Sequence, residues 1–199
     1  ARQAGKAADV LSQVLNMARS IKAPAQERAV ASMLAQAHGA QQNFEAALQA
    51  STRTLELTRQ LGFQQMEAVD TYNVGLFNLM LKRPSEAVAL FKQAQDKVTD
   101  NANPNFMKEL LFNLGMSQIQ IGEKNAGETN IRDALPKANQ VKDWTKLLVG
   151  HQQLAELAKE RGDVAEAQKQ YADALKIAEQ TKNTEARKRL KERMKGLRA

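Results

Sequence analysis

Apolar side chains recur every three or four residues along most of the chain, and short polar breaks separate these stretches. Residues 154–180, LAELAKERGDVAEAQKQYADALKIAEQ, show two such stretches on either side of a Gly-Asp pair at 162–163. Apolar spacing of this kind is typical of amphipathic helices, and Gly marks a helix end. The segment is therefore predicted to be a helical hairpin.

The hairpin pattern repeats every forty residues, which is the separation of Gly75 and Gly115. The chain holds four such units in succession, with no gap between them. Small residues recur at three positions of each unit. Gly115 is one of them, although Gly inside a helix costs about 1 kcal/mol relative to Ala. Small residues at matched depths let two antiparallel helices pack closely, so Gly115 is predicted to be tolerated for this reason. The three sets are Ala35, Gly75, Gly115 and Ala155; Ala47, Ala87, Gly127 and Ala167; and Thr54, Ala94, Ala134 and Ala174.

These positions resemble the tetratricopeptide repeat, whose pattern includes a Leu-Gly pair and a later A-x3-F element. Leu114-Gly115 and Val74-Gly75 match the first element, and Ala87 to Phe91 matches the second. The period of this chain is longer than the usual repeat of about 34 residues. The aromatic residue that the family places at the fourth position is absent from all four units, where Ala31, Thr71, Leu111 and His151 stand.

The resemblance implies an all-α fold, a right-handed α-solenoid of antiparallel helix pairs with about ten helices. Residues 5–22 align with a second helix of a pair, so a first helix is expected before residue 1 and the chain is expected to be a fragment. The predicted segments are a partial repeat (1–27), four repeats (28–67, 68–107, 108–147 and 148–182) and a basic capping helix (183–199).

Prolines locate some of the predicted helix boundaries. Pro24 and Pro104 are two repeat periods apart and therefore stand at the same phase of the repeat. Each is suited to the first turn of a helix, where its missing N–H is not needed. Pro136 falls inside a predicted second helix, and we expect it to kink or end that helix.

The charge of the chain is concentrated at one end. The net charge is +7, and residues 183–199 carry seven Lys and Arg against two Glu. Such a helix binds nucleic acid, an anionic membrane or an acidic partner, or it simply caps the solenoid. Glu185 and Glu192 interrupt the basic face and no aromatic residue accompanies it, so the capping interpretation is favoured over nucleic acid or membrane binding. No apolar run is long enough to span a bilayer, and a cytoplasmic location is expected.

Little in the sequence points to catalysis. Cysteine is absent, which excludes disulfides and thiolate chemistry. The two histidines, His38 and His151, fall at repeat positions that face the hairpin interior, where we expect them to replace core aromatics. There is no metal-binding H-E-x-x-H and no phosphate-binding glycine loop. We predict a protein that is not an enzyme and has no cofactor or metal.

The resemblance places the functional surface on the first helix of each pair, which lines a concave groove that takes partner peptides. Repeats two and three present apolar residues and two asparagines there, whereas repeats one and four present polar ones. An apolar patch rimmed by polar residues is typical of a protein-binding surface. The predicted groove residues are Tyr72, Asn73, Leu76, Leu79, Met80, Phe112, Asn113, Met116, Ile119, Gln152, Gln153 and Glu156.

We therefore predict a protein-interaction scaffold that binds a peptide or helical segment of another protein. The family's clamp for a C-terminal carboxylate is not expected, because Tyr72, Leu76, Asn113 and Glu109 stand where it needs Lys and Arg. Two alternatives remain open: an adaptor that binds nucleic acid or membrane through the basic helix, and self-association through helix 5–22.

Overall fold

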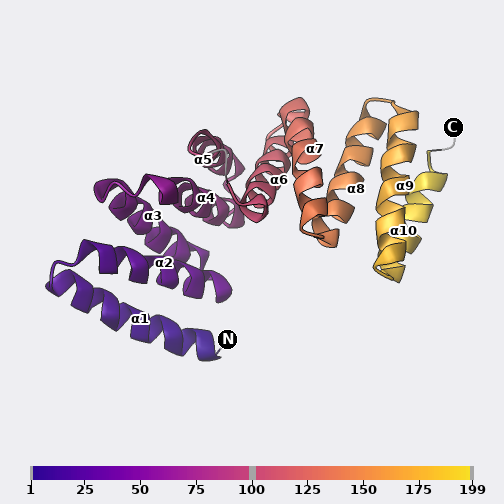
Figure 1. Cartoon of the computed structure of the whole chain (residues 1–199). Coiled ribbons are helices and arrows are strands. Elements are labelled where there is room, and N and C mark those ends of the chain that lie inside the picture. The colour runs from indigo at the N-terminus through magenta and orange to yellow at the C-terminus, as the bar shows by residue number, and fades with distance from the viewer. Residues whose placement is uncertain (1, 99–101, 198–199) are drawn as a thin grey trace. The chain divides into compact units, whose positions relative to one another are not determined.

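The chain folds as a succession of antiparallel helical hairpins (Figure 1). The computed structural model describes residues 2–98 and 102–197; residues 1, 99–101 and 198–199 of the predicted segments lie outside the described part. The described residues form ten helices and no strand, which confirms the all-α prediction. The helices are α1 (Arg2–Ser20), α2 (Pro24–Ala40), α3 (Phe44–Gln60), α4 (Gln64–Met80), α5 (Pro84–Asp96), α6 (Pro104–Gln120), α7 (Lys124–Gln140), α8 (Trp144–Glu160), α9 (Val164–Gln180) and α10 (Thr184–Lys195).

The helices divide into two compact units, one of residues 1–101 and one of residues 102–199. The first unit holds α1 to α5 and the second holds α6 to α10. Within each unit every helix contacts its neighbours in sequence, as expected of a solenoid built from hairpins.

The turns show that the forty-residue repeat is divided into two halves of nearly equal length. Most helices have 17 residues and are joined by turns of three, in place of a longer linker after each hairpin. One residue of each such turn has a positive φ, and the N–H of the next residue bonds back to the carbonyl five residues earlier, as Asp163 does to Ala158 at 2.9 Å. This is the Schellman arrangement that ends a helix. The left-handed residues are Lys22, Gln42, Gly62, Lys82, Gly122, Lys142, Gly162 and Lys182.

The small residues that mark the repeat all lie in the interior. All twelve are buried, including Thr54, the one residue that is neither Ala nor Gly. α6 and α7 approach most closely where Gly115 faces Gly127. A Cβ on Gly115 would lie 2.7 Å from the carbonyl oxygen of Gly127, and a Cβ on Gly127 would lie 2.6 Å from that of Gly115. Two backbones therefore meet here, which explains why a helix interior accepts these glycines.

Pro24 and Pro104 begin α2 and α6, as predicted, and Pro84 likewise begins α5. The prediction that Pro136 ends its helix is wrong, because α7 continues to Gln140. Pro136 is exposed, while Ala134 and Ala138 on either side of it are fully buried. Burial of the opposite face offsets the roughly 3 kcal/mol that a proline costs in a helix interior.

Candidate protein-binding surfaces

A stripe of four apolar residues and one asparagine, three of them exposed, runs along α4. Its members, Met66, Val69, Asn73, Leu76 and Met80, are spaced three, four, three and four residues apart and therefore lie on one helix face. Met66, Val69 and Met80 are 46%, 41% and 44% exposed, and Asn73 and Leu76 are half-buried. We call these five residues the α4 stripe.

The other faces of α4 are held by its neighbours. Tyr72 is buried and packs against Phe91 of α5, with ring centroids 5.4 Å apart. Asp70 accepts hydrogen bonds from Arg28 of α2 (2.5 Å) and from Thr58 of α3 (2.6 Å). These contacts fix the rotation of α4 and leave the α4 stripe facing outward.

α2 lies beside the α4 stripe in the first unit. A small hollow between the helices is lined by Ser32 and Gln36 of α2 and by Asn73 of α4. A Cβ on Gly39 of α2 would lie 2.9 Å from the ring of Phe77 of α4, so the first helices of the two repeats approach closely. The hollow beside the α4 stripe is lined mainly by polar side chains, among them Gln36 and Asn73, while Met33 of α2 is 50% exposed.

In the second unit, the corresponding faces of α6 and α8 carry more charge. Phe112 is buried, and the Nζ of Lys146 lies 5.1 Å from its ring centroid. Lys146 also pairs with Glu109 at 3.0 Å. Asn113, Met116 and Ile119, on the same helix as Phe112, are all half-buried, and Ile119 packs against Gly127 of α7.

A second ion pair joins α6 to the start of α8. The Nζ of Lys108 lies 2.6 Å from Asp143 and 3.3 Å from Glu109. Burial opposes the charge on Lys108, but hydrogen bonds to these two carboxylates outweigh it and raise the lysine pKa. The ammonium therefore stays charged in the folded protein.

The polar groove residues of repeat four, Gln152, Gln153 and Glu156, are half-buried on α8. Glu156 accepts a hydrogen bond of 2.5 Å from the hydroxyl of Tyr171 in α9 and forms an ion pair with Arg193 in α10. Burial, together with the neighbouring carboxylate, raises the pKa of Tyr171 to about 12. Glu156 thus ties three helices together.

The predicted groove residues separate into two groups by exposure. Asn73, Leu76 and Met80 lie together on the α4 stripe, whereas Tyr72 and Phe112 are 7% and 6% exposed and pack against neighbouring helices. Leu79 is half-buried, off the line of the stripe. Sequence reasoning missed Met66 and Val69, although their spacing from Asn73 was visible.

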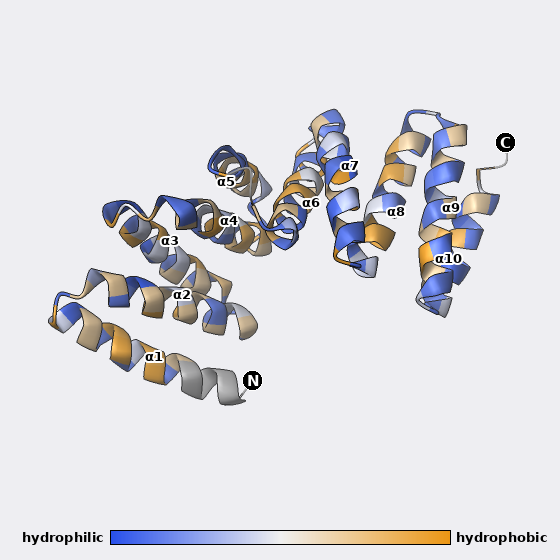
Figure 2. Ribbon diagram, viewed as in Figure 1, coloured by the Kyte–Doolittle hydropathy of each residue, from blue (hydrophilic) through white to orange (hydrophobic). Residues whose placement is uncertain are grey.

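Hydrophobic and hydrophilic residues are mixed along α1 (Figure 2), and four apolar ones form a second exposed stripe along α1 and the turn that follows it. Val10, Val14, Met17 and Ile21 are spaced four, three and four residues apart, and their exposure ranges from 41% to 72%. We call these four residues the α1 stripe. One repeat period later, on α3, the residues that correspond to Val14 and Met17 are Thr54 and Leu57, and both are buried.

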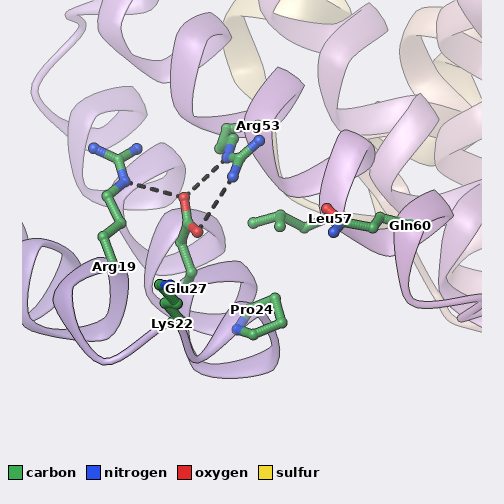
Figure 3. Close-up of a pocket in the computed structure, with 7 residues that line it drawn as sticks. All are labelled: Arg19, Lys22, Pro24, Glu27, Arg53, Leu57 and Gln60. Carbon is green, nitrogen blue, oxygen red and sulfur yellow. Dashed lines mark hydrogen bonds and ion pairs between the residues drawn. The ribbon is translucent and has the colours of Figure 1, made fainter.

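A hollow between α1, α2 and α3 is occupied by ion pairs of the chain itself (Figure 3). Glu27, which is buried, accepts hydrogen bonds from Arg19 at 3.0 Å and from Arg53 at 2.9 Å. The Arg53 hydrogen bond, with the help of Arg19, overcomes desolvation and lowers the pKa of Glu27. The pair Arg59–Glu67 repeats Arg19–Glu27 one period later, again at 3.0 Å. This cluster joins repeats and serves packing.

His38 and His151 are both half-buried. The Nδ1 of His151 hydrogen-bonds Gln170 at 2.7 Å. Among the described side chains, no three Asp, Glu or His residues converge as metal ligands would. None of the described helices has the length and apolar character needed to cross a bilayer.

No protein-family model matches the sequence, and neither does any curated protein. Several solved structures share the fold. BtubC from P. vanneervenii superposes with a TM-score of 0.68 at 14% identity, over 98% of this chain and 91% of that one. PilF from Pseudomonas aeruginosa gives a TM-score of 0.60 at 14% identity, over 98% of this chain and 94% of that one.

A third neighbour is a Rap protein in complex with Competence and Sporulation Factor, with a TM-score of 0.61 at 19% identity. It is matched over 96% of this chain, which spans 57% of the Rap chain. These neighbours are tetratricopeptide-repeat proteins, so the fold of this chain is the tetratricopeptide-repeat fold.

Proposed function

We propose that this tetratricopeptide-repeat chain is a protein-interaction scaffold, with no catalytic step of its own, that binds a helical or extended segment of another protein on its first helices. The observation that carries the proposal is the α4 stripe, in which Met66, Val69 and Met80 are exposed along one face. Exposed apolar residues gathered on one face of a soluble protein are typical of an interaction site.

The chemistry of the α4 stripe suits a peptide with apolar side chains. Burial of apolar surface contributes about 25 cal/mol per Å². Methionine adapts to differently shaped partners because its side chain is unbranched and flexible. Asn73, in the middle of the stripe, carries an amide that both donates and accepts hydrogen bonds, as a peptide backbone requires.

In the second unit the same function rests on Asn113 and Met116 of α6, the counterparts of Asn73 and Leu76 one period later, whereas Ile119 packs against Gly127 of α7. Phe112 and Tyr72 support the surface from below, because both are almost fully buried. Among the fold neighbours, the Rap protein is known in complex with a factor. That complex supports a binding role for this fold.

The proposal is tested by capture of partners from the source cell with the wild-type chain and with Val69→Glu. Val69 is 41% exposed, so the substitution leaves the core intact and places a charge in the α4 stripe. Val164→Glu is the matched control, because Val164 is 39% exposed on α9 and far in sequence from the stripe.

We expect a specific protein to be captured by the wild type and by Val164→Glu, and to be lost with Val69→Glu. Equal capture by all three proteins contradicts the assignment of the surface. Circular dichroism at matched concentration checks that the three are equally helical.

A second candidate, self-association, is favoured by the α1 stripe. Four apolar residues between 41% and 72% exposed give α1 a face that a second copy can cover. We expect the weight-average mass in sedimentation equilibrium to rise with concentration and Met17→Glu to abolish the rise. A mass that stays monomeric at high concentration contradicts this candidate.

A further inference from the structure

A groove lies between α9 and α10. It corresponds, one repeat period later, to the groove between α7 and α8, and α9 packs on that earlier groove. One repeat period relates the linings of the two grooves. Arg132, His151 and Leu154 in the earlier groove correspond to Ala172, Lys191 and Met194 in the later one.

In the earlier groove, α9 bonds to Arg132 and His151, and Leu154 is fully buried. Arg132 of α7 pairs with Glu166 of α9 at 2.7 Å, and His151 of α8 hydrogen-bonds Gln170 of α9 at 2.7 Å. The groove between α9 and α10 is therefore shaped to receive a helix, and no helix of the described second unit lies over it.

The later groove differs from the earlier one in charge. Lys169, Lys191 and Lys195 line it, and no carboxylate does. Their counterparts one period earlier are uncharged or weakly basic: Thr129, His151 and Ala155. A helix that lies on the later groove as α9 lies on the earlier one therefore contacts three ammonium groups. At the position where α9 has Gln170, which bonds His151, that helix needs a carboxylate to pair with Lys191.

The floor of the groove is apolar. Leu175 and Met194 are half-buried there beside Ala172, and the hollow has a volume of about 750 Å³. Lys195 pairs with Glu192 of its own helix at 2.9 Å, and both side chains are exposed. Exposed pairs of this kind contribute little, so Lys195 exchanges this partner readily.

We propose that this groove binds an acidic amphipathic helix of another protein. The apolar face of that helix lies on Leu175 and Met194, and two of its carboxylates, one turn apart, pair with Lys191 and Lys195, which are themselves one turn apart on α10. The site goes beyond the proposed scaffold function, because it is separate from the α4 stripe and selects its partner by charge.

The test uses the 199-residue chain and a fluorescent synthetic helix as long as α9. The peptide carries Leu and Ala on one face and Glu one turn apart along its edge, and a second peptide has Gln in place of each Glu. Binding is measured by fluorescence anisotropy with the wild type, Lys191→Glu and Arg189→Glu. Arg189 is exposed on the same helix but does not line the groove, so both variants change the net charge equally.

We expect the Glu peptide to bind at least about tenfold tighter than the Gln peptide, Lys191→Glu to weaken it about tenfold or more, and Arg189→Glu to change it less than about twofold. Val69→Glu leaves this binding unchanged, which separates the groove from the α4 stripe. Equal binding of the two peptides, or equal loss with the two charge reversals, overturns the proposal. Tighter binding of anionic vesicles or duplex DNA, weakened by Lys191→Glu, also overturns it.

Discussion

Gly115 and Gly127 show how one residue type sets the distance between two helices. Helix propensity alone predicts that Gly115→Ala stabilises the protein by about 1 kcal/mol. The new methyl group, however, would lie 2.7 Å from a backbone oxygen and 2.9 Å from a side-chain carbon of Ile131. Two backbones have to separate to admit it, and overpacking of a tight core costs about 1–3 kcal/mol.

We therefore predict that Gly115→Ala lowers the free energy of unfolding by about 1–3 kcal/mol, against the direction of propensity. Urea denaturation followed by circular dichroism measures the change. Gly196→Ala is the matched control, because Gly196 has φ of −70° and its Cβ would meet nothing closer than 3.5 Å. A stabilised Gly115→Ala protein would show that α6 and α7 are less closely packed than described.

Glu27 gives the first unit a pH dependence. The two arginines hold its pKa below the ordinary value, so its contribution to stability is complete above the unfolded pKa of about 4.3 and is lost as the pH falls through the lower folded value. Loss of this carboxylate removes the ion-pair partner of Arg19 and Arg53, both of which are partly exposed. We expect this loss to lower the free energy of unfolding by about 1–3 kcal/mol.

Glu27→Gln is accordingly predicted to be less stable than the wild type by about 1–3 kcal/mol at pH 7, with the difference shrinking below about pH 4. Denaturant titrations at several pH values measure it, and Glu45→Gln, at an exposed position, is the control. A difference that does not change between pH 7 and pH 3 would contradict the role given to the carboxylate.

At the scale of the element, each three-residue turn contains one left-handed residue, and Gly and Lys share this position in most turns. An L-residue in this conformation costs about 1–2 kcal/mol. Gly avoids that cost but loses more entropy on folding, which amounts to about 0.4–1 kcal/mol. Replacements at equivalent turns therefore have opposite signs.

We expect Lys142→Gly, where φ is +56°, to raise the free energy of unfolding by about 0.5 kcal/mol. Gly162→Ala, where φ is +77° and no atom lies near the new Cβ, should lower it by about 1 kcal/mol. Thermal unfolding of both variants measures this. Shifts of the same sign would show that φ is not the controlling variable.

The helices themselves were predictable because hydrophobic spacing and Pro or Gly positions act locally. Pro24 and Pro104 mark helix starts from sequence alone. The prediction from Pro136 was wrong, because whether a proline ends a helix depends on how well the rest of that helix is packed. Here Ala134 and Ala138 are fully buried and keep α7 helical. That information is tertiary and is not carried by the spacing.

At the scale of the whole molecule, the fold followed from one sequence period that all four repeats share. The candidate surfaces followed less well, because the same first-helix positions are exposed in one repeat and covered in another. Val69 is exposed, whereas Glu109, one period later on α6, is half-buried and pairs with Lys146 of α8. Met66 and Val69 have no such cover and remain exposed.

Binding of another protein to the α4 stripe is tested by a photo-crosslinking amino acid placed at position 69 or at position 164 in the source cell. Both positions are about equally exposed, so chance collisions affect them equally. We expect a discrete adduct of higher mass from position 69 and none from position 164. No adduct from either position, or the same adducts from both, would contradict it.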